Sequence, residues 1–371
     1  MLDAWGRRLH RPSTLRRMSR ARFGRPFARK SAGALFDLVA GFTYTQVLLA
    51  CVRLELFDRL ADGARSVEAL APALGLSVER AEALLDAAAA IDLIRRRPSG
   101  RYALSMLGAA VRANPGIGAM VEHNVLLYRD LEDPLPLLRG ERDDTELARY
   151  WPYAGSEAPE AIAAPGVMPY TQLMAASQTL VADEILDAFP LAGRRLLMDV
   201  GGGNGTFIRA AAARAPELRF LLFDLPSVAA AAQQAFNEDP VQGPAGAPMA
   251  GHVRCEGGDF LRDPLPRGAD IATLVRILHD QDDTGARRLL RAIREALPDD
   301  GVLLVAEPMR DTPAARRIGD VYFSLYFTAM GRGRARTPAA IRGMLLEAGF
   351  RSVQRCATHV PLQTSLLVAH C

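Results

Sequence analysis

His279 is the histidine whose surroundings best suit proton transfer. It lies in the run Arg276-Ile-Leu-His-Asp280, directly after an apolar segment, residues 271–275, that is typical of a buried strand. A histidine at a strand end can remove a proton from a hydroxyl group, because its pKa lies near neutral pH. Glu307, at the end of a second apolar segment, could hold the ring in the required tautomer. Asp280 is the alternative partner, although it could equally cap the next helix.

A glycine-rich turn follows an earlier apolar segment and opens a helix. It reads Asp199-Val-Gly-Gly-Gly-Asn-Gly205. Glycines let the backbone approach a ligand closely and leave the first amides of the helix free to donate hydrogen bonds. A nicotinamide fingerprint needs glycine at its first, third and sixth positions, and counting from Gly201 the sixth position is Thr206. Asp199 suits a cofactor with a cationic amino-acid end better than one with a pyrophosphate.

Two more strand ends complete a candidate cofactor site. In Phe223-Asp-Leu-Pro226, Asp224 can accept both hydroxyls of a ribose; in Gly257-Gly-Asp-Phe260, Asp259 can accept from an adenine amino group while Phe260 stacks on the ring. Each acid alone could be a helix cap. The carboxyl ends of parallel strands share one edge of an open sheet, so together the three predict S-adenosylmethionine. The predicted cofactor-binding residues are Asp199, Gly201, Gly203, Gly205, Asp224, Leu225, Asp259, Phe260 and Arg276.

The elements that carry these residues follow a regular alternation. Short apolar segments alternate with alanine-rich helices, which is typical of parallel strands beneath crossover helices. Two final segments suit a closing antiparallel hairpin. We predict an α/β fold with a Rossmann-like domain over residues 193–371. The expected strands are 196–200, 220–223, 253–255, 271–275, 302–306, 350–355 and 365–369.

A mainly helical domain is expected over residues 31–192. Residues 34–60 have helical spacing and are apolar on more than one side, so we expect a partner to cover that helix. Residues 66–104 predict two short helices and a hairpin, which together form a winged helix. The second of these helices carries four acids against Arg80 alone, and phosphates would repel it. We therefore predict a scaffold for packing and dimerisation rather than a DNA reader.

Charge is distributed unevenly along the chain. The 371 residues include 45 basic and 42 acidic side chains, for a net charge of +3. Residues 1–30 carry +9, from nine arginines and Lys30 against Asp3, so residues 31–371 carry −6. A mildly acidic body lacks the positive face that nucleic acid requires, which excludes that class of partner. For the basic head we expect a disordered tail, with attraction to anionic lipid as the alternative.

Composition indicates a soluble protein. Apolar residues make up 49% and charged residues 23%, as in ordinary globular chains. The four cysteines lie far apart, without a CxxC pair or a histidine at metal-ligand spacing, so we expect reduced thiols and no metal site. Residues 31–50 have the length of a membrane span, but Asp37 and Gln46 interrupt them. Arg16-Arg17 could begin an export signal, yet no cleavage site follows a compact apolar core. We expect a cytoplasmic protein.

The motifs have a familiar order. Gly-Gly-Gly-Asn-Gly, Phe-Asp-Leu-Pro, Gly-Gly-Asp-Phe, Leu-His-Asp and Ala-Glu-Pro resemble the caffeic-acid and hydroxyindole type of S-adenosylmethionine-dependent O-methyltransferase, over nearly the whole chain after residue 31. The resemblance implies a winged-helix dimerisation domain, a homodimer and a Rossmann-like catalytic domain. It also implies that His279 is the catalytic base, that Asp224 binds ribose, and that Asp259 and Phe260 contact adenine.

Two positions depart from that pattern. The family usually has tryptophan after the His-Asp pair, whereas this chain has Gln281. Plant members have a second glutamate just before an Arg-Thr step, where this chain has Ala335 before Arg336-Thr337. With one carboxylate missing, either Glu307 suffices to orient His279, or methyl transfer depends mainly on the proximity and alignment of donor and acceptor.

The acceptor is expected to be long and apolar. Residues 114–139, 167–179 and 321–334 offer methionine and aromatic side chains without matched polar ones, although core packing could explain each residue taken alone. The predicted substrate-binding residues are Met120, Tyr128, Tyr170, Met174, Tyr326, Phe327 and Met330.

Five stretches are similar to the carotenoid branch of the family, the hydroxyneurosporene or demethylspheroidene O-methyltransferases of purple bacteria. The resemblance implies methylation of the tertiary hydroxyl of an acyclic carotenoid, at the inner face of the photosynthetic membrane. A phenolic, polyketide or bacteriochlorophyll-precursor acceptor is the alternative, and a winged-helix regulator is a more distant one. The stretches are Phe36-Asp-Leu-Val-Ala-Gly-Phe, Asn114-Pro-Gly-Ile-Gly-Ala-Met, Leu126-Leu-Tyr-Arg-Asp-Leu, Tyr150-Trp-Pro-Tyr-Ala and Leu173-Met-Ala-Ala-Ser-Gln.

Overall fold

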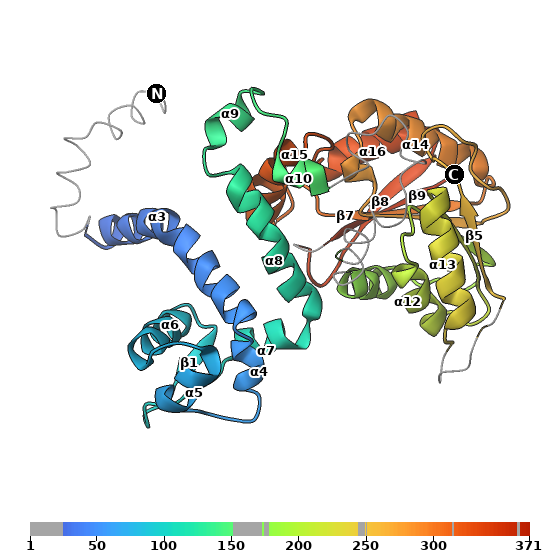
Figure 1. Cartoon of the computed structure of the whole chain (residues 1–371). Helices are drawn as coiled ribbons and strands as arrows, with labels where there is room; N and C mark the ends of the chain where they lie inside the picture. Colours follow the sequence, from blue (N-terminus) through green and yellow to red (C-terminus); the bar gives the residue numbers. More distant parts are fainter. Residues whose placement is uncertain are drawn as a thin grey trace, which may run out of the picture. The chain divides into compact units, whose positions relative to one another are not determined.

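Two compact units make up the structure, and each is described by itself. The computed structural model describes residues 25–150, 173, 178–243, 249, 251–313, 315–361 and 364–371. The units divide between Asn114 and Pro115, so residues 115–150 belong with the second unit rather than with the winged helix. The sequence prediction had grouped residues 31–192 together. Figure 1 shows the elements of both units.

The first unit contains the predicted winged helix. Ser66 and Ser77 accept hydrogen bonds from Ala69 N–H and Arg80 N–H, and so cap the two short helices α5 and α6. The wing pairs β1 with β2 in antiparallel register. The elements are α3 (Arg25–Arg53), α4 (Leu56–Arg59), α5 (Val67–Leu74), α6 (Val78–Ala90), β1 (Ile94–Arg96), β2 (Tyr102–Leu104) and α7 (Met106–Ala113).

The acids of α6 have partners inside the winged helix. Asp86 accepts a hydrogen bond from Tyr102 Oη at 2.6 Å and pairs with Arg96 of the wing at 3.1 Å. Arg96 also lies 3.4 Å from Glu82. Two of the four acids therefore join the helix to the wing, which agrees with a packing scaffold.

Helix α3 presents an apolar face that the described chain leaves exposed. It begins at Arg25, so residues 25–30, which we expected in a tail, are helical, while residues 1–24 lie outside the described residues. By length and composition alone, one helix among the described residues, at Arg29–Arg53, could cross a membrane, a test that a core helix also passes. The exposed apolar side chains are Leu35, Phe36, Leu38, Val39 and Phe42.

The second unit is built on a seven-stranded sheet, in which all seven predicted strands are confirmed. The strand order is β5-β4-β3-β6-β7-β9-β8. β5, β4, β3, β6 and β7 are parallel, whereas β9 runs antiparallel to both β7 and β8, as predicted for a closing hairpin. The strands are β3 (Leu196–Val200), β4 (Arg219–Asp224), β5 (Val253–Gly257), β6 (Ile271–Val275), β7 (Val302–Glu307), β8 (Ser352–Cys356) and β9 (Ser365–His370).

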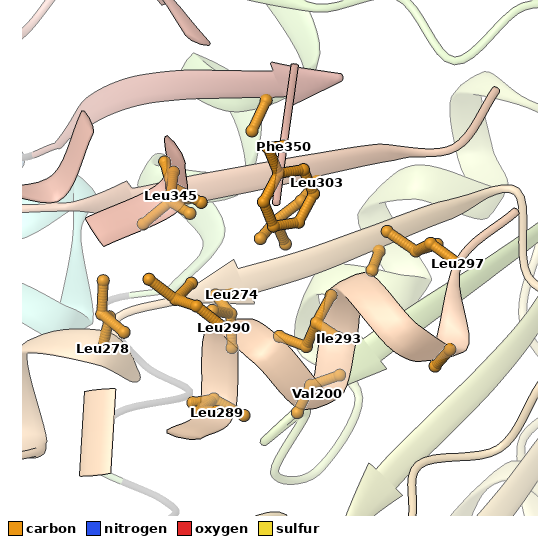
Figure 2. Packing of buried hydrophobic residues seen from close by; sticks show 14 of the residues in the cluster. Val200, Leu274, Leu278, Leu289, Leu290, Ile293, Leu297, Leu303, Leu345 and Phe350 are labelled. Carbon is orange, nitrogen blue, oxygen red and sulfur yellow. The ribbon is translucent and has the colours of Figure 1, made fainter. Parts of the chain in front are cut away.

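Helices cover both faces of this sheet. Helix 178–188, α12 (Thr206–Arg214) and α13 (Pro226–Glu238) pack on one face, and α14 (Asp283–Ala296) and α16 (Pro338–Glu347) pack on the other. Figure 2 shows the second layer, where Leu289, Leu290 and Ile293 of α14 meet Leu274 and Leu303 of the sheet. Burying each such side chain contributes about 1.5–3 kcal/mol.

The order of the strands determines where a ligand can bind. β3 lies between β4 and β6, so the chain turns in opposite directions on its two sides, and open sheets bind ligands at the carboxyl ends of the strands at such a point. The remaining elements of this unit are α8 (Pro115–Asp130), α9 (Pro134–Leu138), α10 (Glu146–Tyr150), η3 (Leu278–Asp280), η4 (Arg317–Tyr322) and α15 (Phe323–Met330).

Candidate active site

The glycine-rich turn after β3 is joined to the end of β4 by Asp224. Its Oδ2 accepts the N–H of Gly203 at 2.8 Å, and its Oδ1 accepts the N–H of Leu225 at 2.7 Å. Gly201 N–H donates to Phe223 O at 2.8 Å. The structure therefore brings the predicted methionyl and ribose positions together at one edge of the sheet.

Gly205 is a position that only glycine fits. Its φ is +79°, in the left-handed region, and a Cβ there would lie 2.1 Å from Cζ of Phe236 on α13. Gly205 is also the N-cap of α12. Close packing of the turn against α13 therefore fixes where the first turn of α12 begins, and the free amides of a helix N-terminus can donate to a ligand.

Asp199 lies buried at the end of β3. Thr273 of β6 donates its hydroxyl to Asp199 Oδ1 at 2.6 Å. Burial raises the pKa of Asp199 to about 7, with the charge of Asp224 adding to the shift and the Thr273 bond opposing it. Burial likewise raises the pKa of Asp224 to about 6, against the two backbone donors. A positively charged ligand would stabilise both carboxylates, so the residues fit S-adenosylmethionine.

The predicted adenine contacts lie at the end of β5. Gly258 N–H donates to Asp224 O at 2.9 Å, which holds this turn beside the ribose acid. Asp259 Oδ1 accepts the N–H of Leu261 at 2.8 Å, so the side chain also caps its own turn. Phe260 is partly buried against the core of the sheet. Asp259 and Phe260 are thus close to the other predicted cofactor residues, while their adenine roles stay a prediction.

His279 stands on a single 3₁₀ turn between β6 and α14. Leu278 of the same turn is fully buried in the core layer of Figure 2. His279 is 5% exposed, and its ring centroid lies 4.9 Å from that of Phe327 and 6.3 Å from that of Phe323. Among the described residues its Nδ1 has no hydrogen-bond partner. The ring therefore lies among the aromatic side chains expected to line the acceptor site.

The two predicted carboxylate partners of His279 are both adjacent to it. Glu307 Oε2 accepts the backbone N–H of His279 at 2.9 Å, so Glu307 holds the main chain and not the ring. Asp280 Oδ1 lies 3.3 Å from ring Nε2, but the two atoms are not aligned for a hydrogen bond. Asp280 is therefore the carboxylate nearer to the ring.

Burial dominates the titration of this group. It lowers the pKa of His279 to about 3, helped by the charges of Arg276 and Arg336. It raises the pKa of Glu307 to about 7, against the Arg336 charge and the His279 N–H, and it raises that of Asp280, with the Glu307 charge adding. The imidazole is neutral at physiological pH and can accept a proton, and an ionised neighbouring carboxylate would stabilise the imidazolium that forms.

Arg336 is a site residue whose importance sequence reasoning missed. Its side chain is buried, and it donates to the carbonyls of Leu278 and Gln281 on either side of His279. In the sequence it appeared only as the arginine after Ala335, because a contact across 58 residues leaves no local pattern.

His123 and Asn124 on α8 were also missed. His123 Nε2 hydrogen-bonds Tyr326 Oη at 2.8 Å, and Tyr322 Oη donates to Asn124 Oδ1 at 2.8 Å. These two bonds tie α8 to η4 and α15. A lone histidine within an apolar helix gave no signal of this pairing.

The acceptor residues predicted from the sequence fall into three groups. The sulfur of Met120 lies 3.9 Å from the Tyr322 Oη. Burial raises the pKa of Tyr322, and Tyr128 adds to the shift. Tyr326, Phe327 and Met330 lie in one buried cluster with Leu127 and Leu147 of α8 and α10, so packing accounts for part of their role. Tyr170 and Met174 lie outside the described residues.

No group of three or more histidine, cysteine or acidic side chains that could hold a metal ion occurs in the part of the chain that the structure describes. The four cysteines are free thiols, and burial raises the pKa of Cys51 to about 12 and that of Cys255 to about 11.

A Rossmann-like sheet closed by an antiparallel hairpin, with a glycine-rich turn after its first strand and acids at the ends of the next two, defines the class of S-adenosylmethionine-dependent methyltransferases. The chain belongs to the O-methyltransferase family: residues 154–351 match its O-methyltransferase domain, and residues 36–111 match its dimerisation domain. It is an S-adenosylmethionine-dependent O-methyltransferase.

Similar proteins support this assignment along most of the chain. The demethylspheroidene O-methyltransferase of Cereibacter sphaeroides is 43% identical over 90% of this chain and 86% of its own length. That of Rhodobacter capsulatus is 40% identical over 92% and 82%. Human N-acetylserotonin methyltransferase in complex with S-adenosylmethionine has a TM-score of 0.72 at 26% identity, over 92% of this chain and 97% of that one.

Proposed function

We propose that this enzyme methylates the tertiary hydroxyl of an acyclic hydroxycarotenoid, with His279 as the general base. The observation that carries the proposal is the 40–43% identity to two demethylspheroidene O-methyltransferases over at least 90% of the chain. The aromatic side chains of η4 and α15 next to His279 suit an apolar acceptor.

The proposed division of labour follows the geometry. Asp199 and Asp224 hold the cationic and ribose parts of the donor, which when bound supplies an electrophilic methyl group. The aromatic side chains of Phe323 and Phe327 exclude water around the ring of His279. His279 takes the hydroxyl proton on its unprotonated ring nitrogen as the acceptor oxygen becomes nucleophilic, and Asp280 stabilises the resulting imidazolium.

A phenolic acceptor is the second candidate. Acetylserotonin O-methyltransferase of Mus musculus is 33% identical, and the 3-hydroxy-5-methyl-1-naphthoate 3-O-methyltransferase of Streptomyces sahachiroi is 30% identical. Both values are lower than those of the two demethylspheroidene enzymes. A bacteriochlorophyll precursor is a further alternative acceptor.

Labelled donor incubated with a 1-hydroxycarotenoid in detergent micelles, or with phenolic acceptors, separates these candidates. We expect label in the carotenoid, at a kcat/KM at least tenfold above that for any phenol. Label in a phenol alone would overturn the carotenoid assignment.

The role of His279 is tested with His279→Gln, which keeps a polar side chain of similar size but cannot take the proton. We expect kcat to fall about 10²–10⁴-fold, the usual contribution of a general base. Calorimetry should give a donor Kd within twofold of the parent. An unchanged kcat would remove His279 as the base and would favour catalysis by proximity and alignment.

We further propose a homodimer held through α3 and a cytoplasmic location at the inner face of the photosynthetic membrane. The +9 charge of residues 1–30 supports contact with anionic lipid, since each basic residue near such a surface adds about 1 kcal/mol. Cosedimentation with phosphatidylglycerol vesicles should be weaker for a chain that begins at Ser31 than for the full chain. Equal binding of the two chains would show that residues 1–30 do not contribute to lipid binding.

A further inference from the structure

Arg336 is a buried charge in a structure whose other arginines are mostly exposed. Its residue is 3% exposed. Its Nη1 donates to Leu278 O at 2.8 Å, its Nη2 to Gln281 O at 2.7 Å, and its Nε to Asp283 Oδ1 at 3.0 Å. Burying a guanidinium costs several kcal/mol unless its donors are satisfied, and here each of its three nitrogens donates.

The two carbonyls that Arg336 binds stand on either side of His279. The turn is held by two further backbone bonds: His279 N–H donates to Glu307 Oε2 at 2.9 Å, and Arg334 N–H donates to His279 O at 2.8 Å. The main chain of the turn is thus fixed before, at and after the histidine. The Nδ1 atom of the ring, by contrast, has no hydrogen-bond partner among the described residues.

The segment that supplies these donors packs tightly on the turn. A Cβ at Gly333 would lie 2.4 Å from His279 O, and φ at Gly333 is +80°. Ala335, next to Arg336, is buried and carries no polar group that could reach the ring. Orientation from this side therefore acts through the main chain.

A guanidinium suits this task because its donors form a rigid planar fork, which can bind two carbonyls at a fixed spacing. A lysine ammonium is a single point on a flexible stem and cannot hold both carbonyls in the same geometry. Replacing Arg336 by lysine therefore keeps the charge and removes the fork.

We propose that Arg336 is a positioning residue for the methyl-transfer reaction, which sets the place of the His279 ring by fixing the backbone turn that carries it. The inference rests on the proposed role of His279 as the base. It concerns Arg336 itself, whose donors go to the carbonyls of Leu278 and Gln281 and to Asp283, so that it acts on His279 through the main chain.

The test is a double-mutant cycle with Arg336→Lys and His279→Gln, measured with the full chain at saturating donor. We expect Arg336→Lys to lower kcat at least tenfold, with the donor Kd and the acceptor KM within threefold. In the His279→Gln background the same substitution should change kcat less than twofold, because there is no longer a base to position. Arg287→Lys on α14, which breaks an exposed pair with Glu347, is the matched control and should keep parent activity.

The outcomes separate this inference from the proposed function. If His279→Gln keeps its activity, the base assignment fails. If His279→Gln is inactive but Arg336→Lys lowers kcat equally in both backgrounds, or not at all, Arg336 does not act through His279. Should Arg336→Lys fail to fold, Asp283→Asn is the second variant, because it weakens the ion pair at Nε and Nη2 and leaves both carbonyl acceptors in place. It should lower kcat at least threefold only when His279 is present. The absence of such an effect would overturn the inference.

Discussion

At the residue scale, the titratable groups of the site are adapted to receiving positive charge. Asp199, Asp224 and Glu307 all have a raised pKa because the protein removes them from water. Each carboxylate is therefore costly to ionise when nothing cationic is near. A cationic donor offsets this cost, which couples binding to the loss of protons.

We predict that donor affinity falls as the pH is lowered from 8 to 5. The pKa of Asp199 is about 7 and that of Asp224 about 6, so both become protonated over this range and lose their attraction for a cation. Kd, measured by calorimetry in a series of buffers, should rise at least tenfold between pH 8 and pH 5. Asp199→Asn should bind more weakly at pH 8 and show a shallower pH dependence. A Kd that is constant from pH 5 to 8 would contradict the assignment.

At the element scale, the turn between β3 and α12 depends on the absence of one side chain. Gly205 and Gly193 have nearly the same backbone, with φ of +79° and +80°. A Cβ at Gly193 would meet nothing within 4 Å, whereas one at Gly205 would meet Phe236. Comparing substitutions at the two glycines therefore separates the cost of backbone strain from the cost of a steric clash with Phe236.

Gly205→Ala should therefore cost more stability than Gly193→Ala. Left-handed strain costs each variant about 1–2 kcal/mol, and overpacking against Phe236 adds about 1–3 kcal/mol to the first. Urea unfolding measures both. Gly205→Ala should also weaken donor binding, because the turn moves, while Gly193→Ala should not. Equal unfolding free energies for the two variants would show that Phe236 on α13 can move away from the added Cβ without loss of stability.

The connection between α8 and α15 also belongs to this scale. Tyr326→Phe removes the hydroxyl that hydrogen-bonds Nε2 of His123. Nδ1 of His123 has no hydrogen-bond partner among the described residues, and burial lowers the pKa of His123 to about 4. We expect a loss of about 1–3 kcal/mol in the free energy of unfolding, the cost of an unsatisfied buried group. Tyr322→Phe, whose partner Asn124 is only half-buried, should cost less. A larger loss of unfolding free energy for Tyr322→Phe would mean that the bond to Asn124 contributes more to the connection between α8 and α15.

The sequence predicts the elements well, but not the contacts between distant ones. The apolar segments led directly to β3 through β9, and the pattern of residues 66–104 led to α5 and α6, because periodicity and turn residues are local signals. The pairing of His123 with Tyr326 spans 203 residues, and no local pattern encodes it. Glu307 was correctly placed beside His279, yet its bond goes to the main chain, since strand order gives proximity but not which atoms meet.

At the scale of the whole molecule, the exposed apolar face of α3 indicates that a partner covers this helix. Leu38 and Phe42 are 77% and 70% exposed in the single chain, within the part that matches the dimerisation domain. Contiguous apolar surface of this kind is costly in water and marks an interaction site. A second copy of the chain is the partner that the domain match favours.

We predict that replacing Leu38 and Phe42 together by glutamate yields a monomer. Two buried carboxylates without partners would oppose an interface far more than the lost apolar area alone. Sedimentation velocity should give the mass of one chain, 40.2 kDa, for the variant and twice that for the parent. Leu135→Glu, an equally apolar exposed position on α9, should leave the parent mass unchanged. A double variant that sediments as a dimer would move the interface away from α3 and leave its apolar face free to contact a membrane.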